Sequence, residues 1–195
     1  LEQISGKSFS QYMQEDIFQP LGMKHSYWFL QEIPHDNLAH PHEIAPEKEP
    51  EVLNHYGFAS FPDGQLRTTA TDYAQVLKLM INRGKVNGAT FLSEKTIDAY
   101  LEIQYPEVAK HQAITWNYNE FDAFSYILFM PRYLFTRKLP AHTGFDPGVE
   151  TYVVFDPKKK RGAVIFINSP LIEWRGVRVY HVMIKKLFKE AKHSS

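Results

Sequence analysis

The sequence contains no cysteine among its 195 residues, and this absence removes several kinds of chemistry. Disulfide bonds, thiol catalysis and zinc sites built on thiolates are excluded. The compartment stays open, because many exported proteins also lack cysteine. There is also no apolar run as long as the roughly 18 residues that a membrane-spanning helix needs, so no membrane span is predicted.

An excess of charge of one sign is also absent, because Lys and Arg together number 22 and so do Asp and Glu. Balanced charge gives no electrostatic case for binding to nucleic acid or to an anionic membrane. Hydrophobic residues make up 44% of the chain and charged residues 23%, which is typical of a globular protein. A chain of this length buries roughly 70% of its unfolded surface, so a hydrophobic core is expected.

Several short motifs of known chemistry are missing as well. The sequence has no Gly-x-Ser-x-Gly turn, phosphate-binding loop, Gly-x-Gly-x-x-Gly or His-Glu-x-x-His. No Ser is followed by Lys three residues later, and no Tyr or Ser is followed by Asn two residues later. The start, Leu1–Lys7, has no initiator Met and no signal-peptide pattern. A fragment or a processed chain is therefore expected.

Helical periodicity of apolar residues predicts four helices. They are expected at residues 8–18, 70–82, 94–103 and 174–191. The first three follow a Ser or Thr suited to an N-cap, namely Ser8, Thr69 and Ser93. Asp72 stands three residues after Thr69, in the position of a capping box. The predicted terminators of the first two helices are Pro20 with Gly22, and Gly84.

The pattern changes to strands in the second half of the chain. Strands are expected at residues 114–118, 124–129, 135–145, 149–155 and 162–168. The last two should form an antiparallel pair, and the basic run between them, Lys158–Arg161, is interpreted as a solvated hairpin tip. The consecutive apolar residues Tyr152–Phe155 suit a strand that is covered on both faces. The order of elements predicts an α+β fold, an antiparallel β-sheet flanked by helices.

Residues 31–54 form a long, proline-rich and irregular connection. Connections of this length are often functional or cover a site. His40 and His42 flank Pro41, which suggests a metal site. Further possible ligands nearby are Asp36, Glu43 and His55. Because Pro41 fixes an extended backbone that sends the two histidines to opposite sides, a polar surface loop is preferred, and neither a metal nor a cofactor is predicted.

A polar triplet, His142-Thr143-Gly144, lies in a predicted strand and is followed by Asp146-Pro147-Gly148. Three earlier segments occur with it in a fixed order: Pro20-Leu21-Gly22-Met23, Gly64-Gln65-Leu66-Arg67-Thr68-Thr69 with Asp72, and Leu92-Ser93-Glu94-Lys95-Thr96. Together these segments resemble motifs of the serine β-lactamase and penicillin-binding-protein superfamily. The similarity is greatest to its class C-related β-lactamases, esterases and D-aminopeptidases. Residues 1–195 are accordingly expected to be the carboxy-terminal portion of a single domain.

The resemblance implies acyl-transfer chemistry on an ester, amide or peptide, without a cofactor. In the family, the Ser of a Ser-x-x-Lys helix attacks a carbonyl, Lys and a Tyr move protons, and water releases the acyl group. By position, His142 would replace the family's Lys, Thr143 would offer a hydroxyl, and Gly144 would let the substrate approach. The backbone N–H of Phe145 would be a donor in the oxyanion hole.

The replacement of Lys by His142 also bears on the substrate. Lysine has a reference pKa of about 10.4 and histidine of about 6.5, so His142 is the poorer permanent anchor for a carboxylate. This favours an esterase or a peptidase over an efficient β-lactamase. The alternative is that His142 is a hydrogen-bonded strand residue without a part in the chemistry.

The Ser-x-x-Lys and Tyr-x-Asn motifs of the family are absent from the 195 residues, so the chain by itself is expected to be inactive. Three interpretations stay open. The chain is a piece of a complete serine hydrolase that acts on a small molecule or peptide, or a non-catalytic binding module. Alternatively it is a subunit that another chain completes, by swapping or in a hetero-oligomer. The resemblance implies a periplasmic or secreted location.

Overall fold

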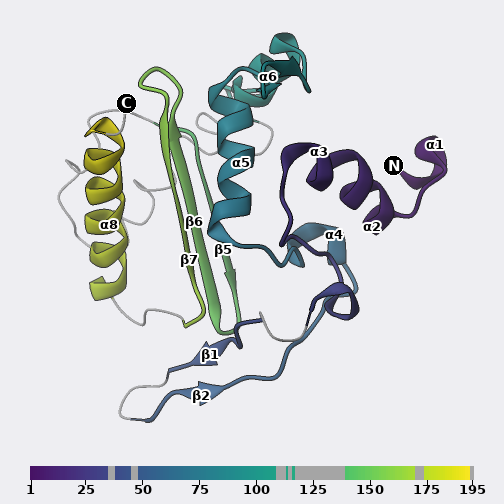
Figure 1. Ribbon diagram of the computed structural model, residues 1–195. Coiled ribbons are helices and arrows are strands. Elements are labelled where there is room, and N and C mark those ends of the chain that lie inside the picture. The colour runs from purple at the N-terminus through teal and green to yellow at the C-terminus, as the bar shows by residue number, and fades with distance from the viewer. Residues whose placement is uncertain are drawn as a thin grey trace.

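The computed structural model describes residues 1–34, 38–44, 48–108, 113, 116, 139–169 and 174–193. Side chains at 174–179, 181, 192 and 193 are outside this description. The protein has the predicted α+β fold. A three-stranded antiparallel sheet stands in the middle, with helix α5 (Ala70–Ile81) on one face and helix α8 (Trp174–His193) on the other (Figure 1).

The remaining elements precede or surround this layer. The other helices are α1 (Glu2–Ser5), α2 (Phe9–Tyr12), the π-helix η1 (Met13–Phe18), α3 (Gln19–Leu21), the 3-10 helix η2 (Leu30–Glu32), α4 (Phe61–Gly64) and α6 (Glu94–Leu101). The strands of the central sheet are β5 (Ala141–Asp146), β6 (Val149–Asp156) and β7 (Arg161–Ile167), in that order. Two small hairpins pair β1 (His42–Glu43) with β2 (Glu51–Val52), and β3 (Lys85–Val86) with β4 (Ala89–Thr90).

The first predicted helix is longer than expected. Ser8 caps it as predicted, but the prediction that Pro20 ends it is wrong. Pro20 lies inside the continuous helical run, two residues after the π-helix η1 ends at Phe18. Gly22 ends the helix with a left-handed φ of 73°, and the N–H of Met23 donates to the carbonyl of Phe18 at 2.8 Å. These two features form a Schellman motif.

The N-terminus of α5 confirms one prediction and corrects another. Thr69 is the N-cap, because its hydroxyl accepts the N–H of Asp72 at 3.1 Å. The capping box is wrong: the carboxylate of Asp72 turns away from the helix and accepts the N–H of His25 at 2.6 Å and the hydroxyl of Ser26 at 2.9 Å. Asp72 therefore joins α5 to the segment that follows α3.

The end of α5 also differs in detail from the prediction. The helix stops at Ile81, and Arg83, with φ of 57°, is the first left-handed residue. Gly84 follows with φ of 86°, and its N–H donates to the carbonyl of Leu79 at 2.8 Å. A Cβ at Gly84 would lie 2.1 Å from the carbonyl oxygen of Leu92, so only glycine fits there.

Ser93 is confirmed as the N-cap of α6, since its hydroxyl accepts the N–H of Thr96 at 3.0 Å. Replacing Ser93 by Ala should lower the free energy of unfolding by about 1 kcal/mol, measured by urea denaturation. Ser60→Ala is the matched control, because Ser60 holds the N-cap position of α4 without a side-chain hydrogen bond. Equal losses in the two variants would contradict the capping role.

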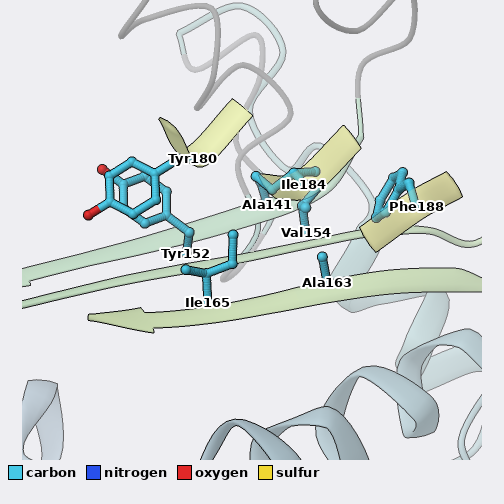
Figure 2. Close-up of a cluster of buried hydrophobic side chains, with 8 residues drawn as sticks. All are labelled: Ala141, Tyr152, Val154, Ala163, Ile165, Tyr180, Ile184 and Phe188. Atoms are coloured by element: carbon cyan, nitrogen blue, oxygen red, sulfur yellow. The ribbon is translucent and has the colours of Figure 1, made fainter. Parts of the chain in front are cut away.

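Strand β6 is covered on both faces, as its apolar sequence predicted. On one face Tyr152 and Val154 pack against α8, together with residues from all three strands and the helix (Figure 2). That cluster consists of Ala141, Tyr152, Val154, Ala163, Ile165, Tyr180, Ile184 and Phe188. On the other face Val153 and Phe155 pack against Leu77 and Met80 of α5 and Ile97 of α6.

Helix α8 presents most of its predicted apolar stripe to the sheet. Tyr180, Ile184 and Phe188 are buried there. Leu187 was expected in the same stripe, but its side chain is 40% exposed. Successive helical residues point roughly 100° apart. Because Phe188 faces the sheet, Leu187 falls at the edge of the apolar stripe. The expected stripe members Val177 and His181 have side chains outside the described residues.

Part of the predicted strand region lies outside the described residues. This holds for residues 114–118 apart from Trp116, for 124–129, and for the first part of 135–145, of which β5 is the described remainder. Within the part of the chain that is described, no helix combines the length and apolar character needed to cross a bilayer.

Candidate functional site

Strand β5 carries the four residues that the sequence predicted for the site, and its register divides them between two faces. His142 lies opposite Val153, whose side chain packs beside α5. Directly opposed residues share a face and successive residues alternate, so His142 and Gly144 face α5. Thr143 and Phe145 face the α8 side, and the Phe145 side chain is 73% exposed.

The main chain of Phe145 points to the open edge of β5. The N–H of Phe155 donates to the carbonyl of Pro140 at 3.2 Å, which makes this a hydrogen-bonded pair. Such pairs alternate with non-hydrogen-bonded ones along an antiparallel ladder, and Phe145 with Glu150 falls on a non-hydrogen-bonded position. The N–H of Phe145 therefore points away from β6. On that side β5 has no partner among the described strands.

His142 is exposed at the surface of this strand. Its ring meets the ring of Trp116 edge to face, with centroids 6.4 Å apart. An exposed imidazole can exchange protons with a bound molecule or with solvent. The role of His142 in place of the family's Lys stays a prediction.

Gly144 lies close to the side chain of the residue opposite it in the sheet. A Cβ at this position would lie 2.6 Å from Oγ1 of Thr151, the residue opposite on β6. The role of Gly144 in letting a substrate approach the strand stays a prediction. Thr151 was not found by sequence reasoning, although counting back from the two-residue turn Pro147–Gly148 would have paired it with Gly144.

A cavity of about 480 Å³ opens on the α5 face of the sheet, beside Thr151, the residue opposite Gly144. The sheet contributes Asp146, Val149, Thr151, Phe166, Ile167 and Asn168 to its lining. The opposite wall comes from residues 64–69, which include Arg67, and from Leu38, Ala39, Pro41, His55, Tyr56 and Phe58. The cavity combines an apolar surface with a few polar groups, as small-molecule sites do.

The cavity is lined by charged groups of both signs. Burial lowers the pKa of Arg67, and burial together with the negative charge of Asp63 raises the pKa of Asp146. Burial and then the charge of Asp146 raise the pKa of Tyr56. The guanidinium of Arg67 is held by main-chain carbonyls, those of Trp28, Gln65 and Tyr56. A cation fixed in this way can also attract an anionic group that enters the cavity.

The irregular segment before α4 covers the end of the sheet next to this cavity (Figure 1). The N–H of His42 donates to the carbonyls of Asn168 at 2.9 Å and Gly148 at 3.3 Å. The hydroxyl of Tyr56 donates to the carbonyl of Pro147 at 2.6 Å. The sequence left the role of this connection open, and the structure shows that it packs on the turn between β5 and β6.

The histidines of this segment do not converge. The rings of His40 and His55 stack with centroids 4.2 Å apart, and Nδ1 of His42 lies 3.5 Å from the amide nitrogen of Asn168. Stacked rings direct their nitrogens along parallel planes and not toward a common point. Among the described residues, no three His, Asp or Glu side chains gather as a metal site; Asp36 lies outside that set.

The stacked pair predicts a dependence of stability on pH. Burial lowers the pKa of His55 below its usual 6.5, and positive charge on His40 and then Arg67 lowers it further. The folded state therefore binds fewer protons than the unfolded state, so this stability is complete above pH 6.5 and is lost as the pH falls through the folded pKa. The Tm should decrease on acidification below pH 6.5, and His55→Gln should flatten that decrease. His25→Gln, at an exposed position, should leave the profile unchanged; an equal effect there would contradict the assignment.

Comparison with known proteins gives a family match over most of the chain. A family model described as Beta-lactamase matches residues 1–182. None of the curated proteins matches the chain significantly.

Solved structures match the fold at low sequence identity. An octameric penicillin-binding protein homologue from Pyrococcus abyssi shares 22% identity at a TM-score of 0.65, over 94% of this chain and 39% of that one. D-alanine carboxypeptidase AmpC from Burkholderia cenocepacia shares 19% at 0.64, over 97% and 57%. A LovD9 mutant of simvastatin synthase from Aspergillus terreus shares 18% at 0.70, over 98% and 52%. The chain thus spans about half the length of the structures it matches, or less.

Proposed function

We propose that this chain, which belongs to the beta-lactamase family, supplies one wall of the active site of a serine hydrolase. The reaction proposed is acyl transfer through a covalent acyl-enzyme, on an ester, amide or peptide. Residues 1–195 are then the carboxy-terminal portion of a single catalytic domain. The fold of the chain and its family match support this assignment.

The observation that carries the proposal is the direction of the Phe145 N–H. It points away from β6, to the edge of β5 that has no partner among the described strands. Asp146, the next residue of the same strand, lines the cavity. An N–H fixed by a sheet needs no reorganisation when negative charge develops on a substrate oxygen. One donor of this kind is typically worth about 100- to 1000-fold in rate.

The other site residues have supporting roles in this proposal. The carbonyl to be attacked lies against the edge of β5, with its oxygen at the Phe145 N–H. His142, exposed two residues after Pro140, hydrogen-bonds the substrate, and Thr143 offers its hydroxyl. Asp146, Thr151 and the wall opposite hold the substrate's side group in the cavity.

The nucleophile of this reaction lies outside the 195 residues. In the family's Ser-x-x-Lys motif the lysine follows the serine by one helical turn, so that both share a face, and no serine here is followed by a lysine three residues later. One matched structure is described as a D-alanine carboxypeptidase, which favours a peptide substrate. A binding module that keeps this wall without a nucleophile is the alternative.

The test compares the complete protein with the isolated 195-residue chain. Each is mixed with a chromogenic ester and a chromogenic β-lactam, and intact mass is measured during the first turnovers. The proposal expects an acyl adduct and burst kinetics for the complete protein and neither for the isolated chain. An adduct on the isolated chain would overturn the placement of the nucleophile. Absence of an adduct on the complete protein would leave the binding module in its place.

A further inference from the structure

The balanced net charge of the sequence conceals a strong separation of charge along the chain. Residues 156–195 contain ten of the 22 Lys and Arg but only three of the 22 Asp and Glu, so their formal charge is +7 and that of residues 1–155 is −7. Separation on this scale creates a local positive potential that net charge does not report.

The first part of this basic region is the tip of the β6–β7 hairpin. Lys158, Lys159 and Lys160, the tip lysines, are all exposed. The carboxylate of Asp156 accepts the N–H groups of Lys158 at 3.1 Å and Lys159 at 3.0 Å, which folds the turn and uses the acidic group closest to it. The tip is therefore a shaped cationic projection.

The second part is the outer side of α8. Lys185, Lys186 and Lys189, the helix lysines, are exposed and point away from the stripe that Ile184 and Phe188 bury in the sheet. Val182 lies on the same outer side and is 58% exposed. Exposed apolar side chains at the flanks of this side are Met183 and Leu187. The outer side of α8 thus mixes lysine with apolar side chains.

The two parts are neighbours in space. Nη1 of Arg161, at the base of the hairpin, donates to the carbonyl of Phe188 at 2.8 Å, and its guanidinium lies 4.7 Å from the centroid of the Phe188 ring. Helix α8 runs beside β7, and its carboxy-terminal end lies by the hairpin tip (Figure 1). None of the six lysines forms an ion pair with a carboxylate of the described residues.

We propose that the tip lysines and the outer side of α8 form a docking surface for an anionic lipid bilayer. Lysine stems can lie along the apolar boundary while their ammonium groups stay with the lipid phosphates and carboxylates. Each lysine near such a surface adds roughly fivefold to the binding constant. Val182 and its apolar neighbours then enter the headgroup region, as in other interfacial helices.

The composition of this surface favours an anionic lipid over nucleic acid and over the acidic part of a second copy of the chain. Among the described side chains of this surface the six exposed cations are lysines, whereas nucleic-acid surfaces are enriched in arginine, whose planar fork fits phosphate and guanine edges. The exposed apolar side chains between the lysines have no role against a phosphate backbone. Pairing with a second copy of the chain would require a complementary apolar patch on the acidic part of that copy. The experiment distinguishes this alternative from lipid binding.

The experiment measures sedimentation of the intact protein with vesicles at about 0.15 M salt. Vesicles of phosphatidylcholine containing phosphatidylserine should bind the protein, and vesicles of phosphatidylcholine alone should not. Reversal of the three tip lysines to Glu, or of the three helix lysines to Glu, should each weaken binding by at least about 100-fold. Val182→Ser should weaken it by about fivefold without changing the charge.

The matched control is reversal of Lys78, Lys85 and Lys95 to Glu, which changes the net charge equally at exposed positions around α5 and α6. It should keep vesicle binding, and circular dichroism should show that all the variants fold. Equal weakening by the control, or binding to duplex DNA in place of vesicles, would overturn the proposal. A third result would also overturn it: the protein forms a dimer that the lysine reversals dissociate, and vesicle binding is lost on dilution. The surface would then bind a second copy of the chain and not lipid.

Discussion

Replacing Asp72 by Ala should lower the free energy of unfolding by about 3 kcal/mol, which is a large part of the stability of a small domain. The Asp72 side chain is buried, with 6% of the residue exposed. Its carboxylate accepts the N–H of His25 at 2.6 Å and the hydroxyl of Ser26, which is fully buried. Truncation leaves two donors without this acceptor where water has little access. Urea denaturation gives the measurement.

Two further variants show whether burial is the cause. Asp72→Asn keeps an oxygen acceptor and loses the charge, so it should cost less than half as much as the alanine variant. Asp98→Ala removes a carboxylate that contacts Arg83 at 2.5 and 2.9 Å on an exposed surface, where water replaces the lost contacts, and its effect should be much smaller. Similar losses for Asp72→Ala and Asp98→Ala would contradict the assignment.

The same residue marks a limit of sequence reasoning. Thr69 and Asp72 have the spacing of a capping box, and the local pattern correctly placed the start of α5. Local spacing contains no information on the segment around Ser26, which lies 46 residues earlier and attracts the carboxylate instead. Helices α5, α6 and α8, both faces of β6 and the hairpin from β6 to β7 were predictable because periodicity and turn residues specify them locally.

Only one part of the candidate site, strand β5, was predictable from the sequence. The triplet at His142–Gly144 and its strand follow from the sequence, and the Asp-Pro-Gly turn fixes the register that turns the Phe145 N–H outward. The cavity was not predictable, because its far wall comes from Tyr56 and Arg67, and no sequence pattern brings these beside Thr151. Contacts between distant segments depend on the tertiary fold.

Gly144→Ala should have the largest effect on activity in the complete protein, at least about a 100-fold loss of kcat/KM for the ester substrate. The added methyl group would meet Oγ1 of Thr151, and where the threonine side chain keeps its rotamer β5 must shift from the position that aims the Phe145 N–H. Misplacement of about 1 Å can cost this much in rate. The same overpacking should lower the free energy of unfolding by about 2 kcal/mol. Activity and stability must therefore be measured on the same samples.

A double-mutant cycle separates the two roles of Gly144. Thr151→Ala removes the hydroxyl that occupies the space, so the double variant Gly144→Ala/Thr151→Ala should regain most of the lost stability. If Gly144 also provides room for the substrate at β5, the double variant should stay at least about 10-fold less active than Thr151→Ala alone. Recovery of activity in step with stability would mean that Gly144 serves only the pairing of β5 with β6. In that case the Phe145 N–H, and not clearance at Gly144, would be the contribution of this strand to catalysis.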